Sequence, residues 1–304
     1  MEYIFKSKDI TKSYKHRKAL NGVTMNIKKG DIYGFVGENG SGKTTIIRVI
    51  TGLIFPDSGS FELFGIANTS PQILTARKKL GAIVESPSIY LNMSAYENLK
   101  MQSVILGSYD ENKIKEVLSL VGLSYLENDK KKAGDFSLGM RQRLGIAMAL
   151  LNDPELLILD EPMNGLDPAG IVEIRELILK LNKEKGITFL ISSHILTELS
   201  LVATNYGIIS KGKIIKEVSA EQLKNECRNY THIEVDDVEA LVSVLEKQYD
   251  FDTDANGAKV YGDVSLNDML SGIIDAGIAI KAINTVKSSI EDYYLSVIGG
   301  NKND

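Results

Sequence analysis

The stretch Gly37-Glu38-Asn39-Gly40-Ser41-Gly42-Lys43-Thr44-Thr45 decides the fold of this chain. Its spacing, a glycine followed after four residues by Gly-Lys-Thr, is that of a P-loop. Residues 31–36 before it predict a short buried strand, and residues 44–50 after it carry isoleucines at helical spacing. A strand, a glycine-rich loop and a helix in this order indicate a phosphate-binding site. The alternative is a flexible turn that happens to contain a lysine.

The chemistry expected of this loop follows from its residue types. Glycines let the backbone curl so that successive N–H groups point at phosphate oxygens, and the helix N-terminus adds its dipole. Lys43 is expected to reach the β- and γ-phosphates, and the Thr44 hydroxyl to bind Mg²⁺. The loop therefore predicts a nucleotide-binding site, without telling which class of protein carries it.

Composition narrows the classes of protein. The 304 residues are 43% hydrophobic and 25% charged, which is typical of a globular protein, and the formal net charge is −5. Nucleic-acid binding usually needs a basic surface, so no nucleic-acid partner is expected. The lone Cys227 cannot form an internal disulfide and suits a reducing cytoplasm. The longest uncharged run, residues 63–76, is too short and polar to span a bilayer, so membrane work would need another chain.

The pattern along the chain predicts an α/β fold with two domains. Residues 1–220 begin with antiparallel strands and continue with short strands alternating with helices, which indicates a mainly parallel sheet. Residues of about 87–152 are helical almost throughout and predict a helical subdomain inserted between two strands. Residues 221–304 predict a small accessory α/β domain whose part after residue 230 holds three strands and three helices.

Acidic residues end the apolar run 156–159. A carboxylate at the carboxyl end of a strand beside a P-loop is where Mg²⁺ has to be held, so Asp160 is expected to bind the metal, through water. Glu161 projects one residue further and is a candidate general base. His194 follows the strand predicted at 187–191 and is a candidate donor to the γ-phosphate. The bland alternatives are an acidic pair that only ends a strand and a packed or surface histidine.

A second anion-binding helix start is predicted at Ser137-Leu138-Gly139-Met140-Arg141-Gln142. A serine cap, a small residue and then a helix leave N–H groups free to bind phosphate. The chain then has two phosphate-binding helix starts and other machinery for one nucleotide only. This mismatch indicates that the second start serves a nucleotide bound by another subunit.

The order of these motifs resembles the ATP-binding subunits of ABC transporters over residues 1 to about 220. The stretch 37–45 resembles Walker A, and 156–161 resembles Walker B with its catalytic glutamate. Residues 137–142 resemble the family signature usually written LSGGQ, Asn164-Gly165-Leu166-Asp167 resembles the D-loop, and His194 resembles the switch histidine. The resemblance implies a RecA-like P-loop NTPase fold with an antiparallel β subdomain.

Some positions differ from the family pattern or change meaning under it. The spacing around Tyr14 favours a core position, whereas the resemblance implies that its ring stacks on adenine. Ser137 and Gly139, which would touch phosphate, are retained, although the second and fourth signature positions differ. Glu85 stands where the family has a coupling glutamine; it can hold Mg²⁺ or water but cannot donate a hydrogen bond. Glu85 and the stretch 92–99 resemble the bacitracin-resistance and lantibiotic-immunity branch, and residues 221–304 resemble that branch's C-terminal extension.

The resemblance implies an ATPase that uses ATP with Mg²⁺ and drives export of, or immunity to, an antimicrobial peptide. Asp167, Ser137 and Gly139 would contact the nucleotide across a head-to-tail homodimer or heterodimer. Separate integral membrane permease subunits would dock near the helical subdomain and hold the chain at the inner face of the cell membrane. The alternatives are a soluble ABC-type ATPase that acts on a partner such as the ribosome, and a P-loop kinase.

Overall fold

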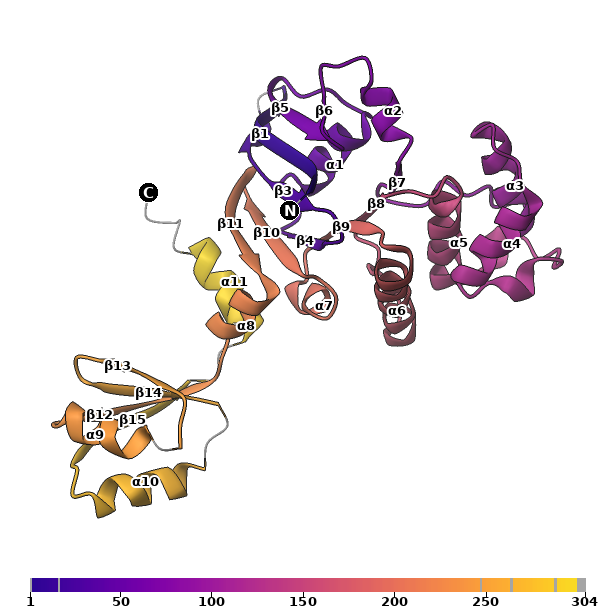
Figure 1. Ribbon diagram of the computed structural model, residues 1–304. Coiled ribbons are helices and arrows are strands. Elements are labelled where there is room, and N and C mark those ends of the chain that lie inside the picture. The colour runs from indigo at the N-terminus through magenta and orange to yellow at the C-terminus, as the bar shows by residue number, and fades with distance from the viewer. Residues whose placement is uncertain (1, 16, 247, 263–264, 287–288, 300–304) are drawn as a thin grey trace. The chain divides into compact units, whose positions relative to one another are not determined.

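The computed structural model describes residues 2–299 except 16, 247, 263, 264, 287 and 288. The chain divides into two compact units, Met1–Ala220 and Glu221–Asp304 (Figure 1). Among the described residues, no helix combines the length and the apolar character that a membrane span requires.

A six-stranded sheet forms the centre of the first unit. Its strand order is β11-β10-β4-β9-β8-β7, and only β11 is antiparallel to its neighbour. The strands are β4 (Ile32–Val36), β7 (Leu80–Ile83), β8 (Leu156–Asp160), β9 (Thr188–Ser193), β10 (Asn205–Ser210) and β11 (Lys213–Ser219). Every residue of β4, β8 and β9 is buried, as expected for strands covered on both faces. The predicted α/β fold with a mainly parallel sheet is confirmed.

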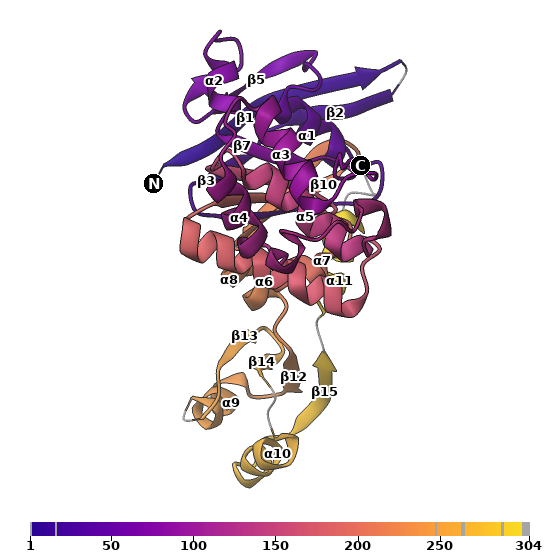
Figure 2. The ribbon, with the colours of Figure 1, turned by 90° about the vertical axis from the view of Figure 1, so that its right-hand side faces the viewer.

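A second, antiparallel sheet covers the helix that follows the glycine loop. It contains β1 (Tyr3–Tyr14), β2 (Arg17–Val23), β3 (Asn26–Lys28), β5 (Ser58–Leu63) and β6 (Ile66–Ala67). Figure 2 shows β1 and β2 side by side. Helix α1 (Lys43–Thr51) buries Ile46, Ile47 and Ile50 in one core that also includes residues of β1, β5 and β8. The helix that carries the loop is therefore fixed from both sheets.

Three helices of the first unit lie between β7 and β8 in the sequence. They are α3 (Ala95–Ile105), α4 (Glu111–Leu120) and α5 (Leu138–Leu150), with short 3₁₀ turns at Ser124–Leu126 and Ala133–Asp135. Ser94 and Glu97 form the capping box that starts α3. The remaining helices are α2 (Ile73–Arg77), α6 (Pro168–Lys185) and α7 (Leu196–Ser200). In Figure 1, α3, α4 and α5 form one group, apart from α1.

The second unit has its own sheet and core. Its strands β12 (Tyr230–Val235), β13 (Phe251–Asp254), β14 (Gly257–Tyr261) and β15 (Ile280–Val286) pair antiparallel in the order β13-β14-β12-β15. Helices α9 (Val238–Leu245) and α10 (Leu266–Asp275) complete a βαββαβ arrangement. In the sequence, α8 (Ala220–Glu226) precedes this arrangement and α11 (Ile290–Gly299) follows it. The sequence pattern missed β13, because only Phe251 of its four residues is apolar.

Candidate nucleotide-binding site

The loop between β4 and α1 has a conformation that only glycine allows at several positions. Gly40 and Gly42 have φ of +77° and +117°, in the left-handed region. A Cβ at Gly37 would lie 2.4 Å from the carbonyl oxygen of Ile209. The glycines are thus needed for the shape of the loop, and the loop leads directly into the N-terminus of α1, whose first turn holds no acidic residue.

Lys43 folds back over this loop. Its ammonium group donates to the carbonyl oxygens of Gly37 at 2.6 Å and Glu38 at 3.3 Å, and it lies 3.2 Å from Oε1 of Glu161. Only 5% of Lys43 is exposed. A buried cation, a helix N-terminus and a curled loop together make a site for an anion with several oxygens. Thr44 and Thr45 are half-buried in the same first turn.

Two parallel strands deliver a carboxylate and a hydroxyl to the edge beside the loop. Asp160 of β8 is paired in register with Ser192 of β9, and Ser192 Oγ donates to Asp160 Oδ1 at 2.5 Å. Asp160 is 2% exposed, and its second oxygen, Oδ2, has no hydrogen-bond partner among the described residues, which is also true of the buried Ser41 Oγ. Buried oxygens without partners suit a hard cation such as Mg²⁺.

The described part of the chain holds no group of three His, Cys, Asp or Glu side chains arranged to bind a metal by themselves. Mg²⁺ usually takes only one or two protein oxygens and completes its shell with water and substrate phosphate. The donor set near Asp160 therefore fits a nucleotide-bound Mg²⁺ rather than a metal held by protein alone.

Glu161 connects Lys43 with His194. Its Oε2 lies 2.8 Å from Nδ1 of His194, while Oε1 faces Lys43. Its backbone has φ of +51°, and its N–H donates to Ser192 Oγ at 2.9 Å, which holds this uncommon conformation. Burial raises the pKa of the neighbouring Glu198 carboxyl; the positive charge of His194 opposes this shift and the negative charge of Glu161 adds to it. Glu161, His194 and Glu198 line one small pocket.

The other predicted anion-binding start lies elsewhere on the first unit. Ser137 caps α5, and its Oγ accepts a hydrogen bond from Met140 N at 3.2 Å. Asp167 caps α6 in the same way, through Gly170 N at 3.0 Å. Ser137, Gly139 and Asp167 line one cavity of about 460 Å³, whose lining includes no residue of the glycine loop. Ser137 and Asp167, which stand 30 positions apart in the sequence, thus meet at one cavity whose lining does not include Lys43 of the same chain.

Three side chains lie in places that the sequence did not predict. Tyr14 is 43% exposed at the end of β1, which excludes the core position that spacing alone favours; the adenine-stacking role that the resemblance implies stays a prediction. The Glu85 carboxylate, considered above as a metal ligand, is paired with Arg48 of α1 at 2.6 Å. Arg17 donates to the carbonyl oxygen of Gly40 at 2.7 Å and so supports the loop. Its only signal in the sequence was a basic stretch, which gives no partner.

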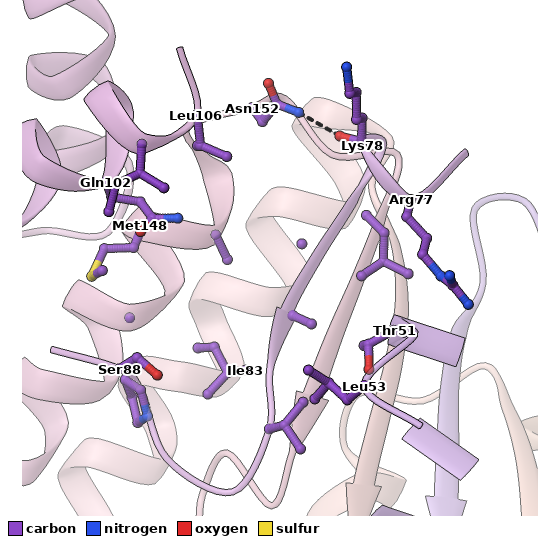
Figure 3. A pocket seen from close by; sticks show the side chains of 18 of the residues that line it. Thr51, Leu53, Arg77, Lys78, Ile83, Ser88, Gln102, Leu106, Met148 and Asn152 are labelled. Carbon is purple, nitrogen blue, oxygen red and sulfur yellow. Dashed lines mark hydrogen bonds between the residues drawn. The ribbon is translucent and has the colours of Figure 1, made fainter. Parts of the chain in front are cut away.

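A large cavity opens between the parallel sheet and the helices, with a volume of about 900 Å³. Figure 3 shows Leu53 and Arg77 on one side of it and Gln102, Leu106 and Met148 on the other. Leu53 is 64% exposed and Leu106 41%. Asn152 donates to the carbonyl oxygen of Lys78 and joins the two sides at one end.

Known proteins are similar to this chain in sequence and in fold. Residues 20–164 match the family described as ABC transporter. The bacitracin transport ATP-binding protein BcrA of Bacillus licheniformis is 44% identical over 307 residues and covers 99% of both chains. The lantibiotic transport ATP-binding protein SrtF of Streptococcus pyogenes is 46% identical over 222 residues, which are 73% of this chain and 93% of SrtF.

Solved structures of ABC transporter ATP-binding proteins have a fold similar to that of this chain. The cbiO1 protein of Clostridium perfringens, part of the ABC transporter complex cbiONQ, matches with a TM-score of 0.67 at 29% identity and covers 74% of this chain and 92% of its own. The ATP-binding cassette MJ0796, solved as a dimer with ADP and Pi, matches with a TM-score of 0.64 at 26% identity over 71% of this chain and 98% of its own. The resemblance seen in the motifs is confirmed. The chain belongs to the ATP-binding proteins of the ABC transporter family.

Proposed function

We propose that this chain hydrolyses ATP to power separate membrane subunits that export, or give immunity to, an antimicrobial peptide of the bacitracin or lantibiotic kind. The observation that carries the hydrolytic part is the position of Glu161, whose carboxylate lies between Lys43 of the glycine loop and His194. The class of transported peptide rests on the relatives that are named for bacitracin and lantibiotic transport.

In the proposed mechanism the phosphates of ATP rest on the N–H groups of residues 37–45. The ammonium of Lys43 then exchanges its contact with Glu161 for the β- and γ-phosphates. Thr44 and Asp160 would hold Mg²⁺ together with the phosphates, and the bound metal would supply charge neutralisation at the phosphate oxygens. The Tyr14 ring is proposed to stack on adenine, which its exposed position at the end of β1 permits.

The freed Glu161 carboxylate accepts the proton of the attacking water. His194 orients this carboxylate, because its Nδ1 lies 2.8 Å from Glu161 Oε2 and has to carry a proton to bond a carboxylate. Its other ring nitrogen, Nε2, donates to the γ-phosphate when the ring is in the imidazolium form. One side chain thereby holds both the base and the phosphate.

A second chain is proposed to complete each site. The Ser137 start of α5, with Gly139 and Asp167, forms an anion-binding cavity that includes none of the loop residues of its own chain. In a head-to-tail homodimer or heterodimer this cavity would close over the ATP bound by the partner's glycine loop. The dimeric structure of MJ0796 supports this arrangement.

Mixing two inactive variants tests the arrangement. Lys43→Ala has a damaged loop and Ser137→Arg a blocked helix start, so each alone is expected to be inactive. A mixed dimer combines the loop of one chain with the helix start of the other and contains one intact site. We expect ATP hydrolysis to reappear on mixing, measured as phosphate release. If the mixture of the two variants stays as inactive as each variant alone, a chain does not use the Ser137 of its partner, and the proposed arrangement is wrong.

The partner permease is proposed to dock in the 900 Å³ cavity, through a segment with an apolar face. The exposed Leu53 and Leu106 and the neighbouring Met148 provide apolar lining on both sides. Docking there would hold the chain at the inner face of the cell membrane. Residues 221–304 are proposed to act as an accessory domain that is not part of the phosphate chemistry.

Leu53→Glu is expected to remove the chain from its membrane partner, because a carboxylate buried in an apolar contact loses its hydration. The measurement is co-purification of a polytopic membrane protein with the tagged chain. Ile274→Glu is the matched control, since Ile274 is 63% exposed and lies on α10 of the other unit. ATP binding should be unchanged in both. Equal co-purification of the two variants would place the docking site elsewhere.

A further inference from the structure

An ion pair links the helix of the glycine loop to the segment after β7. Arg48 lies in the last turn of α1, and its Nη2 is 2.6 Å from Oε1 of Glu85, two residues beyond the end of β7. Glu85 has φ of +63°, in the left-handed region that glutamate rarely adopts. The side chains of Arg48 and Glu85 are 37% and 62% exposed. Such an exposed pair is weak and can be exchanged for another contact.

The position of Glu85 makes its negative charge relevant to nucleotide binding. Strands β7 and β8 are parallel neighbours; Glu85 follows the carboxyl end of β7 by two residues and Glu161 follows that of β8 by one. The carboxyl ends of parallel strands meet at one edge of the sheet, which is here the edge proposed to receive phosphates. A glutamine at this position would be neutral. A free glutamate would repel a nucleotide triphosphate that arrives without a metal.

We propose that Arg48 is a positioning residue for Glu85. The guanidinium of Arg48 neutralises the Glu85 carboxylate and holds it away from the phosphate edge until a bound metal–nucleotide complex replaces Arg48 as the partner of this carboxylate. This inference rests on the proposed function of the site. It explains how the chain tolerates an acidic residue beside a triphosphate. The guanidinium supplies the compensating charge in the empty site, and the divalent cation supplies it in the filled one.

The pair also ties the nucleotide-bearing helix to the helical group. Ser86, Pro87 and Ser88 follow Glu85 and line the 900 Å³ cavity. Pro87 packs against Gly145 of α5 so closely that a Cβ at Gly145 would lie 2.5 Å from it. The pair therefore joins α1 to a segment that lines the cavity and packs on α5.

Four chains test the inference: the unchanged protein, Arg48→Gln, Glu85→Gln and the double variant Arg48→Gln/Glu85→Gln. The measurement is the affinity for a fluorescent ATP analogue, once with EDTA and once with Mg²⁺. Arg48→Gln is expected to bind the metal-free nucleotide about three- to tenfold more weakly, because Glu85 is left uncompensated. With Mg²⁺ the loss should nearly vanish. The double variant should bind the metal-free nucleotide as the unchanged protein does.

The affinities of these variants show whether Arg48 acts through Glu85. Equal weakening in Arg48→Gln and the double variant would mean that Arg48 acts without Glu85, and no weakening in either would also overturn the inference. Arg48→Lys keeps the charge and is expected to bind normally, which distinguishes lost charge from a damaged fold. High salt should shrink the loss, since it screens exposed charges. Failure of the unchanged protein to bind ATP at all would instead refute the proposed function.

Discussion

Replacing Glu161 by glutamine is expected to lower kcat for ATP hydrolysis by about 10²- to 10⁴-fold, the usual contribution of a positioned general base. Glutamine has nearly the same shape and can still contact His194, but its amide cannot take a proton from water. It also loses the ion pair with Lys43, which leaves that lysine free for phosphate. ATP binding should therefore persist, as measured by titration with a fluorescent analogue beside an assay of phosphate release.

Glu155→Gln is the matched control. Glu155 stands just before the other end of β8, where it pairs with Lys79 at 2.8 Å, far along the strand from the loop. Its loss should leave hydrolysis close to that of the unchanged protein. Because Glu161→Gln is expected to hold ATP without consuming it, the variant should also accumulate as a dimer with ATP and Mg²⁺. Brisk hydrolysis by Glu161→Gln would refute the proposed role of Glu161 as the base.

The glycine loop was predictable from sequence because its chemistry is local. Strand, loop and helix follow one another within about twenty residues, and each has a strong pattern of its own. The capping box of Ser94 and Glu97 is equally local, because its two residues stand three positions apart in the sequence. Asp160 and Glu161 could be assigned to the same edge as the loop because the carboxyl ends of parallel strands always share an edge.

Contacts between distant segments were not predictable. Arg48 and Glu85 are 37 residues apart, and Arg17 and Gly40 are 23 apart. No periodicity records such pairs, because an exposed arginine or glutamate is equally compatible with solvent. Spacing alone favoured a core position for Tyr14, because spacing does not record exposure; only the resemblance implied a ring outside the core, and Tyr14 is 43% exposed.

The same limit applies to charge at the site. Sequence reasoning considered Glu85 as a metal ligand by itself, whereas the structure gives it a cation of its own. It also treated Lys43 only as a ligand of phosphate, whereas in the structure Lys43 also pairs with Glu161. Both acidic residues are therefore paired with a cation of the protein itself. Under the proposed mechanism a nucleotide and its metal would replace these cations, so ATP binding would be coupled to the release of both carboxylates.

Replacing Lys43 by alanine is expected to weaken ATP binding by about 10- to 100-fold, since a hydrogen bond to a charged group contributes about 1.5–3 kcal/mol. The lost affinity should depend on the outer phosphates, because Lys43 lies over the loop proposed to bind them, whereas the base is proposed to stack on Tyr14. AMP, which lacks the β- and γ-phosphates, should bind the variant and the unchanged protein equally. Competition against a fluorescent ATP analogue measures both affinities.

Lys79→Ala controls for the loss of a lysine as such, since Lys79 forms an exposed pair with Glu155. It should bind ATP normally. Loss of AMP and ATP affinity to the same extent in Lys43→Ala would indicate a collapsed loop rather than a missing phosphate contact. Lys43→Arg helps to separate a collapsed loop from a missing phosphate contact. Arginine keeps the positive charge, but it is larger than lysine, and the position is tightly enclosed because Lys43 is only 5% exposed. Selective loss of ATP over AMP is therefore the result that assigns Lys43 to the outer phosphates.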